Sequence, residues 1–299
     1  MNPAPHHSNV VVVGVDFSEP SRHALFEAVR VTGESGARLV VAHFLYDEEM
    51  AHAKRWKGIS ESDIIAGRTA HLEKWLTESG VPRQEIEIRV GIGHPYAELS
   101  RAVSSENAKL LVLGAQGENH KNHGDVVGSV AKSCLRHPST DVLLVRKEHH
   151  EPFRNVLAAI DFSKDSKHAV HRAAEIAKSD DSDLHVVHVF APVWEYYNHR
   201  TEDMDAAVEE HMSELRKRFC DFAYSELQEV KKLPIHFDVR ESFSAYHGIL
   251  EYAKEVDADL VVVGQLGRGR QEMITPGRTA ERVIEKSNCS VLTVYDETP

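Results

Sequence analysis

The chain has 299 residues, 41% of them hydrophobic and 27% charged, and its formal net charge is −12. This composition is that of an ordinary soluble protein, and no apolar run approaches the roughly 20 residues that a membrane span needs. The acidic balance, which no basic stripe offsets, disfavours contact with a nucleic-acid backbone. We therefore expect no membrane insertion and no nucleic-acid partner.

The N-terminal residues and the cysteines favour a cytoplasmic protein. Residues 1–7 lack the basic start and the apolar stretch of a secretory signal. The three cysteines, Cys134, Cys220 and Cys289, are odd in number, far apart and without a Cys-x-x-Cys pair. A reducing compartment is the simplest interpretation.

The sequence is one unit written twice. Val10–Ser18 (VVVVGVDFS) returns as Asn155–Ser163 (NVLAAIDFS), and Leu110–Gly117 (LLVLGAQG) returns as Leu260–Gly267 (LVVVGQLG). The first pair of segments is offset by 145 positions and the second by 150. A period this long indicates a duplicated domain, because solenoid repeats run to about 20–50 residues.

In chain order, the first domain, residues 1–150, alternates strands and helices. Val10–Val15 is a continuous β-branched run, typical of a parallel strand covered on both faces. The helix that follows, from Ser18 to about Thr32, is predicted to end at Gly33 and Gly36. The later predicted elements are a strand over Leu39–Leu45, a helix that carries Leu72, Trp75 and Leu76, a strand over Glu85–Val90, a helix over Tyr96–Val103, a strand over Leu110–Leu113, a helix over Ser129–Leu135 and a strand over Val142–Val145.

The second domain, residues 151–299, repeats this order. Its predicted strands lie at Val156–Ile160, Leu184–Val189, Ile235–Val239, Leu260–Val263 and Val291–Val294. A long polar helix, about Asp203–Val230, contains the extra length. The predicted fold class is α/β, with two tandem repeats, each an open five-stranded parallel sheet with helices on both faces.

Ligands of open α/β sheets bind beyond the carboxyl ends of the strands. Asp16 ends the first strand, and the fourth strand runs into Gly114 and Gly117, followed by Gly128-Ser129 at a helix start. Glycines allow close backbone approach, and the N–H groups at a helix start suit a phosphate. Alternatively, the glycines simply end strands and begin helices.

Two common nucleotide motifs are missing. The chain has no G-x-x-x-x-G-K-[ST] loop, and no G-x-G-x-x-G follows the first strand, which disfavours P-loop hydrolysis and dinucleotide oxidoreduction. The residues that are present resemble the universal stress protein family. In that family an early strand ends in Asp, and a later G-x-x-G is followed by nine residues and then by G-[S/T]. The resemblance covers both halves and implies a Rossmann-like fold of the adenine nucleotide alpha hydrolase type.

Each repeat departs once from that pattern. In the first, ten residues separate Gly117 from Gly128-Ser129, and a flexible loop absorbs one extra residue at low cost. In the second the spacing is nine, but Arg278 follows Gly277 in place of the hydroxyl residue. We therefore expect the first repeat to hold the main site, with Arg278 filling the second cradle or, together with Arg268 and Arg270, clamping an anion.

The resemblance implies a set of ligand-binding residues in each repeat. In the first they are Val15, Asp16 and Phe17 with Ala42 or His43 around adenine, and Gly114, Gly117, Gly128 and Ser129 along ribose and phosphates. In the second they are Ile160, Asp161, Phe162, His188 or Val189, Gly264, Gly267 and Gly277. Either aspartate could equally be a turn or helix-capping residue.

The sequence suggests no metal site and no catalytic residue. His120 and His123 lie in a glycine-bounded loop, but structural zinc usually needs four ligands, so a solvated loop is favoured. His23 and His168 occupy the same place in both repeats and are read as structural. No general base or carboxylate pair accompanies the cradle, so any hydrolysis should be slow.

The leading hypothesis is a cytoplasmic stress-response sensor or regulator that binds ATP, ADP or AMP, with or without Mg²⁺, chiefly in the first repeat. The rival is a scaffold without nucleotide, or a binder of another small ligand; an adenylyl-transfer enzyme is a third hypothesis. We also expect the two repeats to pack on each other through Val142–Val145 and Val291–Val294, since pairing covers sheet edges, and a homodimer is possible.

Overall fold

The computed structural model describes residues 9–48, 59–81, 86–116, 127–137, 139–146, 151–191, 202–227, 233–265 and 278–295. Two compact units divide the chain, the first made of residues 1–151 and 297–299 and the second of residues 152–296. Within the described residues, no helix combines the length and the apolar character that crossing a membrane requires.

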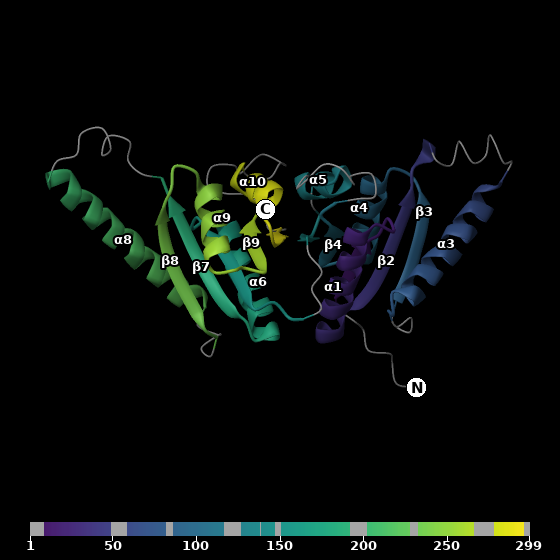
Figure 1. The fold of residues 1–299 in the computed structure, drawn as a ribbon, viewed down its shortest axis with the longest axis horizontal. Helices are drawn as coiled ribbons and strands as arrows, with labels where there is room; N and C mark the ends of the chain where they lie inside the picture. The colour runs from purple at the N-terminus through teal and green to yellow at the C-terminus, as the bar shows by residue number, and fades with distance from the viewer. Residues whose placement is uncertain are drawn as a thin grey trace. The chain divides into compact units, whose positions relative to one another are not determined.

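The first unit is a parallel sheet in the order β3-β2-β1-β4-β5 (Figure 1). The strands are β1 (Val10–Gly14), β2 (Arg38–Leu45), β3 (Ile86–Ile92), β4 (Leu110–Gly114) and β5 (Asp141–Val145). The chain builds outward from β1 to β2 and β3, then returns to place β4 on the other side of β1. The carboxyl ends of β1 and β4 therefore flank the point where the strand order reverses.

Helices cover both faces of this sheet. They are α1 (Glu19–Ser35), α3 (Glu61–Glu78), α4 (Pro95–Glu106) and α5 (Ser129–Arg136). α1 packs on β1, β2 and β4 and α3 packs on β3, while α4 contacts α5 and the strands β1 to β3. The β-branched run of β1 is buried between these layers, with Val12 and Val13 at 0% exposure.

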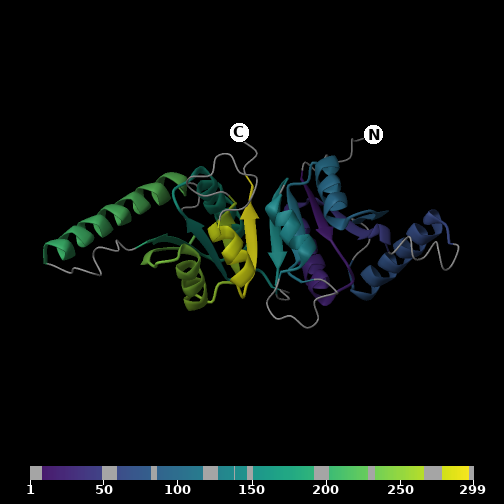
Figure 2. The same cartoon turned by 90° about the horizontal axis from the view of Figure 1, so that it is seen from above.

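The second unit repeats the arrangement in the order β8-β7-β6-β9-β10 (Figure 2). Its strands are β6 (Asn155–Ile160), β7 (Asp183–Phe190), β8 (Ile235–Glu241), β9 (Leu260–Gly264) and β10 (Ser290–Val294). Its helices are α6 (Lys164–Asp180), α8 (Glu202–Glu226), α9 (Ala245–Glu255) and α10 (Arg278–Lys286). α6 contacts α8, and α9 contacts α10 and β7.

The predicted α/β class and the two parallel five-stranded sheets are confirmed, whereas some predicted helix ends are wrong. α1 continues through Gly33 to Ser35, and only Gly36 adopts the left-handed conformation, at φ 66°, that stops it. A glycine inside a helix is tolerated at a cost of about 1 kcal/mol, so Gly33 alone does not end one. α8 ends at Glu226, four residues before the predicted end at Val230, which lies outside the described residues.

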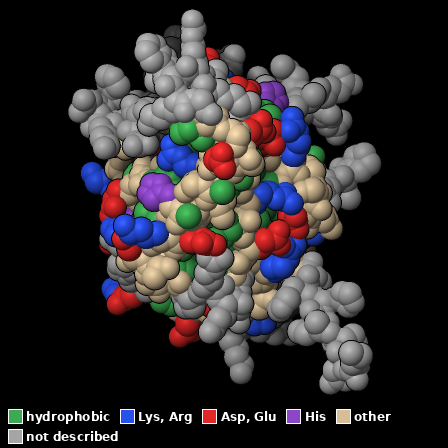
Figure 3. Space-filling model, turned by 90° about the vertical axis from the view of Figure 1, so that its right-hand side faces the viewer, with side chains coloured by type: hydrophobic (Ala, Val, Ile, Leu, Met, Phe, Trp, Pro, Cys, Tyr) green, Lys and Arg blue, Asp and Glu red, His purple; other side chains and the backbone are tan. Residues whose placement is uncertain are grey.

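Acidic and basic side chains are mixed over the face of the molecule drawn in Figure 3. Along the helices, side chains of opposite charge are often neighbours, such as Arg22 with Glu19 and Arg30 with Glu34. Such exposed pairs contribute little stability, about 0–1 kcal/mol each.

Candidate functional site

The turn after β1 is held by Asp16. One carboxylate oxygen, Oδ1, accepts hydrogen bonds from the backbone N–H of Ser18 at 3.1 Å and from its hydroxyl at 2.5 Å. Ser18 is in turn the N-cap of α1 and accepts from the N–H of Ser21. Phe17 between them adopts φ 65°, which a non-glycine residue rarely takes. The proposed turn role of Asp16 is thus realised.

The end of β2 closes one side of this turn. The buried ring of His43 contacts the carbonyl oxygen of Val15 through Nδ1 at 2.9 Å, and the N–H of Val15 donates to the carbonyl of Ala42, also at 2.9 Å. Phe17 lies between His43 and the stacked ring of His71 on α3, with centroids 4.6 and 4.4 Å away. The backbone of Val15 is therefore fixed by β2 and the ring of Phe17 by α3.

The other side is made by the end of β4 and the start of α5. The N–H of Gly128, the N-cap of α5, donates to the carbonyl of Ala115 at 2.9 Å, which holds the helix start against β4. The first backbone N–H groups of a helix have no partner within it. Ser129 is the first residue of α5 and is exposed, so its N–H and hydroxyl are accessible to a ligand.

Gly114 has a packing role that the sequence pattern does not reveal. A Cβ atom at this position would lie 2.6 Å from the backbone carbon and oxygen of Pro20, in the first turn of α1. Gly264 in the second unit is confined in the same way, with Asp165 backbone atoms 2.8–2.9 Å from the Cβ position. Both glycines are needed for strand-to-helix packing, whatever ligand binds nearby.

A cavity of about 200 Å³ lies where these parts meet. It is lined by most of the residues predicted for the first repeat, namely Val15, Asp16, Phe17, Ala42, His43, Gly114, Gly128 and Ser129. Gly117 lies outside the described residues. The structure thus gathers into one hollow side chains that are more than 100 positions apart in the chain.

The lining also contains residues that no motif marks. They are Arg68 of α3, Tyr46 just beyond β2, and Pro95 and Leu99 of α4. A single arginine on an amphipathic helix carries no sequence signal, because its direction depends on how α3 packs. Leu99 follows the apolar spacing of α4, which indicates burial but not what it is buried against.

The lining offers little for catalysis. Of the described lining residues, Asp16 is the one carboxylate, and its Oδ1 atom is engaged by Ser18. The buried thiol of Cys134 on α5 has its pKa raised to about 12 by burial, so it stays protonated and is a poor nucleophile.

The second unit repeats the turn. Asp161 Oδ1 accepts from the N–H of Ser163 at 3.0 Å, and His188 Nδ1 contacts the carbonyl oxygen of Ile160 at 2.9 Å. Phe162, at φ 62°, packs edge-on against Phe222 of α8, with centroids 5.6 Å apart. The residues predicted to complete this site lie outside the described residues: Gly267, Arg268, Arg270 and Gly277, together with the side chain of Arg278. The pair His120 and His123 of the first repeat also lies outside them.

An open parallel sheet with a cavity at its strand-order reversal defines the class of Rossmann-like ligand-binding domains. The chain belongs to the universal stress protein family, whose model matches residues 8–146 and 152–295. The predicted resemblance, in its tandem form, is confirmed.

Relatives of both the single-domain and the tandem kind are similar to this chain. Universal stress protein A homolog 1 of Coxiella burnetii is 32% identical over 146 residues, which are 48% of this chain and 96% of that protein. Universal stress protein E of Photorhabdus laumondii is 25% identical and covers 97% of this chain and 95% of its own length. A universal stress protein structure from Archaeoglobus fulgidus covers 96% of this chain and 98% of its own, with 22% identity and a TM-score of 0.65, and shows the same fold.

A universal stress protein solved in complex with cAMP matches more weakly. It covers 48% of this chain with 23% identity and a TM-score of 0.34, a likeness too low to say what this chain binds.

Proposed function

We propose that the first repeat binds ATP or a related adenine nucleotide and that the protein acts as a nucleotide-responsive regulator in the cytoplasm. The observation that carries the proposal is the single cavity formed by the ends of β1, β2 and β4 and the start of α5. Ligands of open α/β folds bind at this place, where the strand order reverses.

The two ends of the cavity differ in chemistry in the way a nucleotide requires. Val15, Ala42, Leu99 and Leu113 give apolar surface that suits a base. The start of α5 offers backbone N–H groups and the positive end of the helix dipole, and the guanidinium of Arg68 adds positive charge to the lining. The volume is below the roughly 300–1,000 Å³ of typical ligand pockets, so the base and sugar would lie inside and the phosphates along α5.

A regulatory role fits the lining better than an enzymatic one. Among the described lining residues, no second carboxylate stands beside Asp16 to hold Mg²⁺ or to activate water. Binding without rapid turnover suits a sensor, whose state then follows the nucleotide concentration. The free thiols of Cys134 and Cys289 are buried and fit a reducing compartment.

Two observations favour the rival scaffold without a nucleotide. The glycine at position 114 is accounted for by its contact with Pro20, and Asp16 by its bonds to Ser18. Both features would persist in a protein that uses this fold only for packing. The start of α5 and the position of Arg68 at the cavity are not explained by packing, and they support the nucleotide proposal.

Calorimetric titration of the full chain with ATP tests the proposal, using Ser129→Glu and Ser133→Glu as a matched pair. Both variants add one carboxylate to α5, but Ser133 is not among the cavity residues and its hydroxyl bonds back to the carbonyl of Ser129. Losing one charge-assisted hydrogen bond costs about 1.5–3 kcal/mol, or about ten- to hundredfold in affinity. Ser129→Glu should exceed this because it also opposes phosphate, while Ser133→Glu should bind within about twofold of the unmodified protein.

If the unmodified protein bound none of ATP, ADP and AMP, the nucleotide proposal would be overturned in favour of the scaffold hypothesis. Equal loss in both variants would mean that the charge acts on α5 as a whole. Mass spectrometry of small molecules released from the denatured protein should identify an adenine nucleotide.

A further inference from the structure

A cluster of three metal-ligand side chains lies in the second unit, away from the turn after β6. Asp183 is the first residue of β7, His185 follows two residues on, and His236 is the second residue of β8. Since residues two apart in a strand share a face, and His185 is paired directly with His236 across the parallel ladder, all three point to the same side of the sheet. They lie where β7 and β8 begin, whereas the predicted nucleotide-binding residues lie where strands end.

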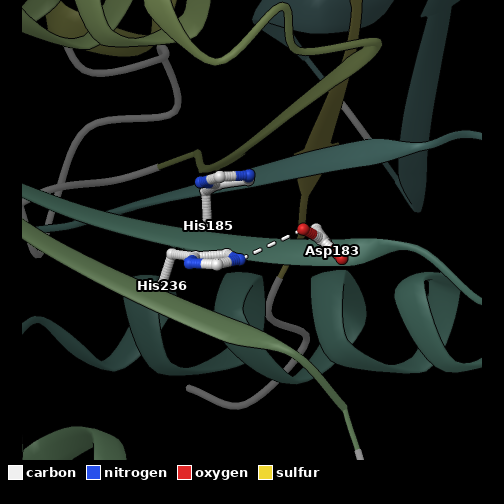
Figure 4. A group of neighbouring side chains, drawn as sticks. All are labelled: Asp183, His185 and His236. Atoms are coloured by element: carbon white, nitrogen blue, oxygen red, sulfur yellow. Dashed lines mark hydrogen bonds and ion pairs between the residues drawn. The ribbon is translucent and has the colours of Figure 1, made fainter.

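The three side chains are close enough to share one ion. One ligand atom from each lies within 4.8 Å of the other two. His236 Nε2 is 3.1 Å from an oxygen of Asp183, and the two imidazole rings are stacked with centroids 4.7 Å apart at 20°. Figure 4 shows the rings one above the other, with the carboxylate of Asp183 at one end of them.

The buried residue of the cluster, His185, is oriented by a neighbouring side chain. Asp183 and His236 reach the surface, whereas His185 is 8% exposed. Its Nδ1 atom lies 3.3 Å from the hydroxyl of Tyr252 on α9. When Nδ1–H donates to that hydroxyl, the lone pair of Nε2 is left for an ion, the arrangement by which outer partners orient metal-binding histidines.

The surroundings hold Tyr252 in place. The guanidinium of Arg240 lies 4.5 Å above the centre of its ring, and Arg240 is itself anchored by Asp238 and Glu255. The hydroxyl that orients His185 is therefore fixed from β8 and from α9.

The first unit provides an internal comparison. At the matching positions it carries Arg38 in place of Asp183, Val40 in place of His185 and Glu87 in place of His236. Arg38 and Glu87 form an ion pair across the strands, so an ordinary ion pair is enough to fill these positions of the fold. Two histidines and a carboxylate are not needed to pair the strands, and their presence calls for another explanation.

We propose that Asp183, His185 and His236 bind a divalent transition-metal ion of the Zn²⁺ type. Two imidazole nitrogens and one carboxylate oxygen form a donor set suited to zinc, whereas Mg²⁺ and Ca²⁺ take oxygen ligands. Three protein ligands leave a fourth tetrahedral position, and the side chains of His236 and Asp183 are 51% and 47% exposed, so water reaches it. Zinc–nitrogen distances of about 2.0–2.1 Å require the rings to turn slightly toward each other, which the exposed His236 can do.

This proposal departs from the sequence-based expectation that the chain has no metal site. It is independent of the nucleotide, because it concerns the other unit and the other end of the strands. An ion here would join β8, the last strand in its unit's order, to β7.

Zinc titration of the metal-free full chain by calorimetry tests the site, with the melting temperature as a second readout. We expect one equivalent to bind and the melting temperature to rise with zinc. His236→Ala should weaken binding at least about a hundredfold, and Tyr252→Phe, which keeps the ring but removes the orienting hydroxyl, about tenfold. His247→Ala is the matched control, because His247 is also an exposed histidine beside one carboxylate, with Glu251 Oε2 at 3.5 Å, and its loss should leave affinity unchanged.

Histidines elsewhere could take up zinc, so a His120→Ala/His123→Ala double variant is titrated in parallel and should bind as the unmodified protein does. Without metal, the His236→Ala variant should have the same melting temperature as the unmodified protein, since His236 is exposed. The proposal is overturned if the unmodified chain takes up no zinc, if His236→Ala retains its affinity, or if the double variant loses it.

Discussion

The strand-beginning ends of the two sheets solve the same packing problem with different chemistry. In the first unit Glu106 accepts from Arg38 and, at 2.7 Å, from Arg89, and Arg38 also pairs with Glu87. These charges compensate one another at any pH near neutrality, and the pKa of Glu106 is lowered, chiefly by its hydrogen bond to Arg38. In the second unit Asp183, His185 and His236 stand at the positions of Arg38, Val40 and Glu87, and Arg240 pairs with Asp238 and Glu255.

That difference changes what the region can respond to. An arginine–glutamate network has all its groups occupied and cannot be deprotonated or metallated under ordinary conditions. The cluster of Asp183, His185 and His236 offers imidazole and carboxylate ligands, whose occupation changes with metal concentration. In the first repeat Arg38 and Arg89 with Glu106 form a static clamp. The second repeat has Arg240 with Asp238 and Glu255 and, in addition, the cluster that can bind an ion, while the turn at the opposite end of the strands is the same in both.

The glycines at the ends of β4 and β9 should give the largest stability effects and should act alike. Gly114→Ala and Gly264→Ala each place a Cβ under 3.0 Å from the backbone of α1 or α6, so each should cost about 1–3 kcal/mol of unfolding free energy by denaturant titration. Gly67→Ala, a helical position with open space around it, should instead stabilise by up to about 1 kcal/mol. If Gly114→Ala is harmless while ATP binding is lost, the glycine serves the ligand and not the packing.

Glu106→Gln should remove the static clamp in a pH-dependent way. A carboxyl whose pKa is lower in the folded than in the unfolded state stabilises above its unfolded pKa, and this is lost as pH falls through the folded value. The variant should therefore be less stable by about 1 kcal/mol at pH 7 and approach the stability of the unmodified protein as pH falls below the ordinary pKa of a glutamate. Glu78→Gln, at an exposed pair with Lys74, should change stability by less than about 0.5 kcal/mol at any pH; a constant difference for Glu106→Gln would contradict this account.

His185→Val replaces His185 with the residue that the first unit has at the matching position, Val40. Burial and then the neighbouring His236 lower the pKa of His185, although Asp183 raises it. The unfolded chain therefore binds a proton that the folded chain does not, and stability falls as pH drops below the ordinary pKa of histidine. Measured with chelator present, the stability of the variant relative to the unmodified protein should improve between pH 7 and 5, by less than about 1 kcal/mol. A difference that does not vary with pH would show that His185 titrates normally.

Gly277→Glu should have the smallest effect. If Arg278 already fills the second cradle, ATP affinity measured by calorimetry should stay within about twofold of that of the unmodified chain, in contrast to Ser129→Glu. A loss equal to that of Ser129→Glu would establish a second working site.

Periodicity and repetition were sufficient to predict the fold, because both sheets are buried on two faces and their strands read as apolar runs. The turn residues Asp16 and Phe17 and the start of α5 could also be placed, since all follow strands that the topology brings together. Arg68 could not, because the direction of a helical side chain depends on packing. The zinc cluster was missed for a related reason, since Asp183 and His236 are 53 residues apart and meet only through the register of β7 and β8. The pairing of the two repeats through their last strands stays a prediction.

The burial of two of the three thiols has a practical consequence. Cys134 and Cys289 are buried, whereas Cys220 is exposed on α8. Burial raises the pKa of the Cys134 thiol to about 12, and a thiol with so high a pKa reacts slowly with alkylating reagents. The native chain should accept one maleimide dye, at Cys220, without any engineered cysteine. The fluorescence of a dye at Cys220 would follow changes in the second repeat. Labelling beyond one equivalent would measure the fraction of molecules that have unfolded enough to expose a buried thiol.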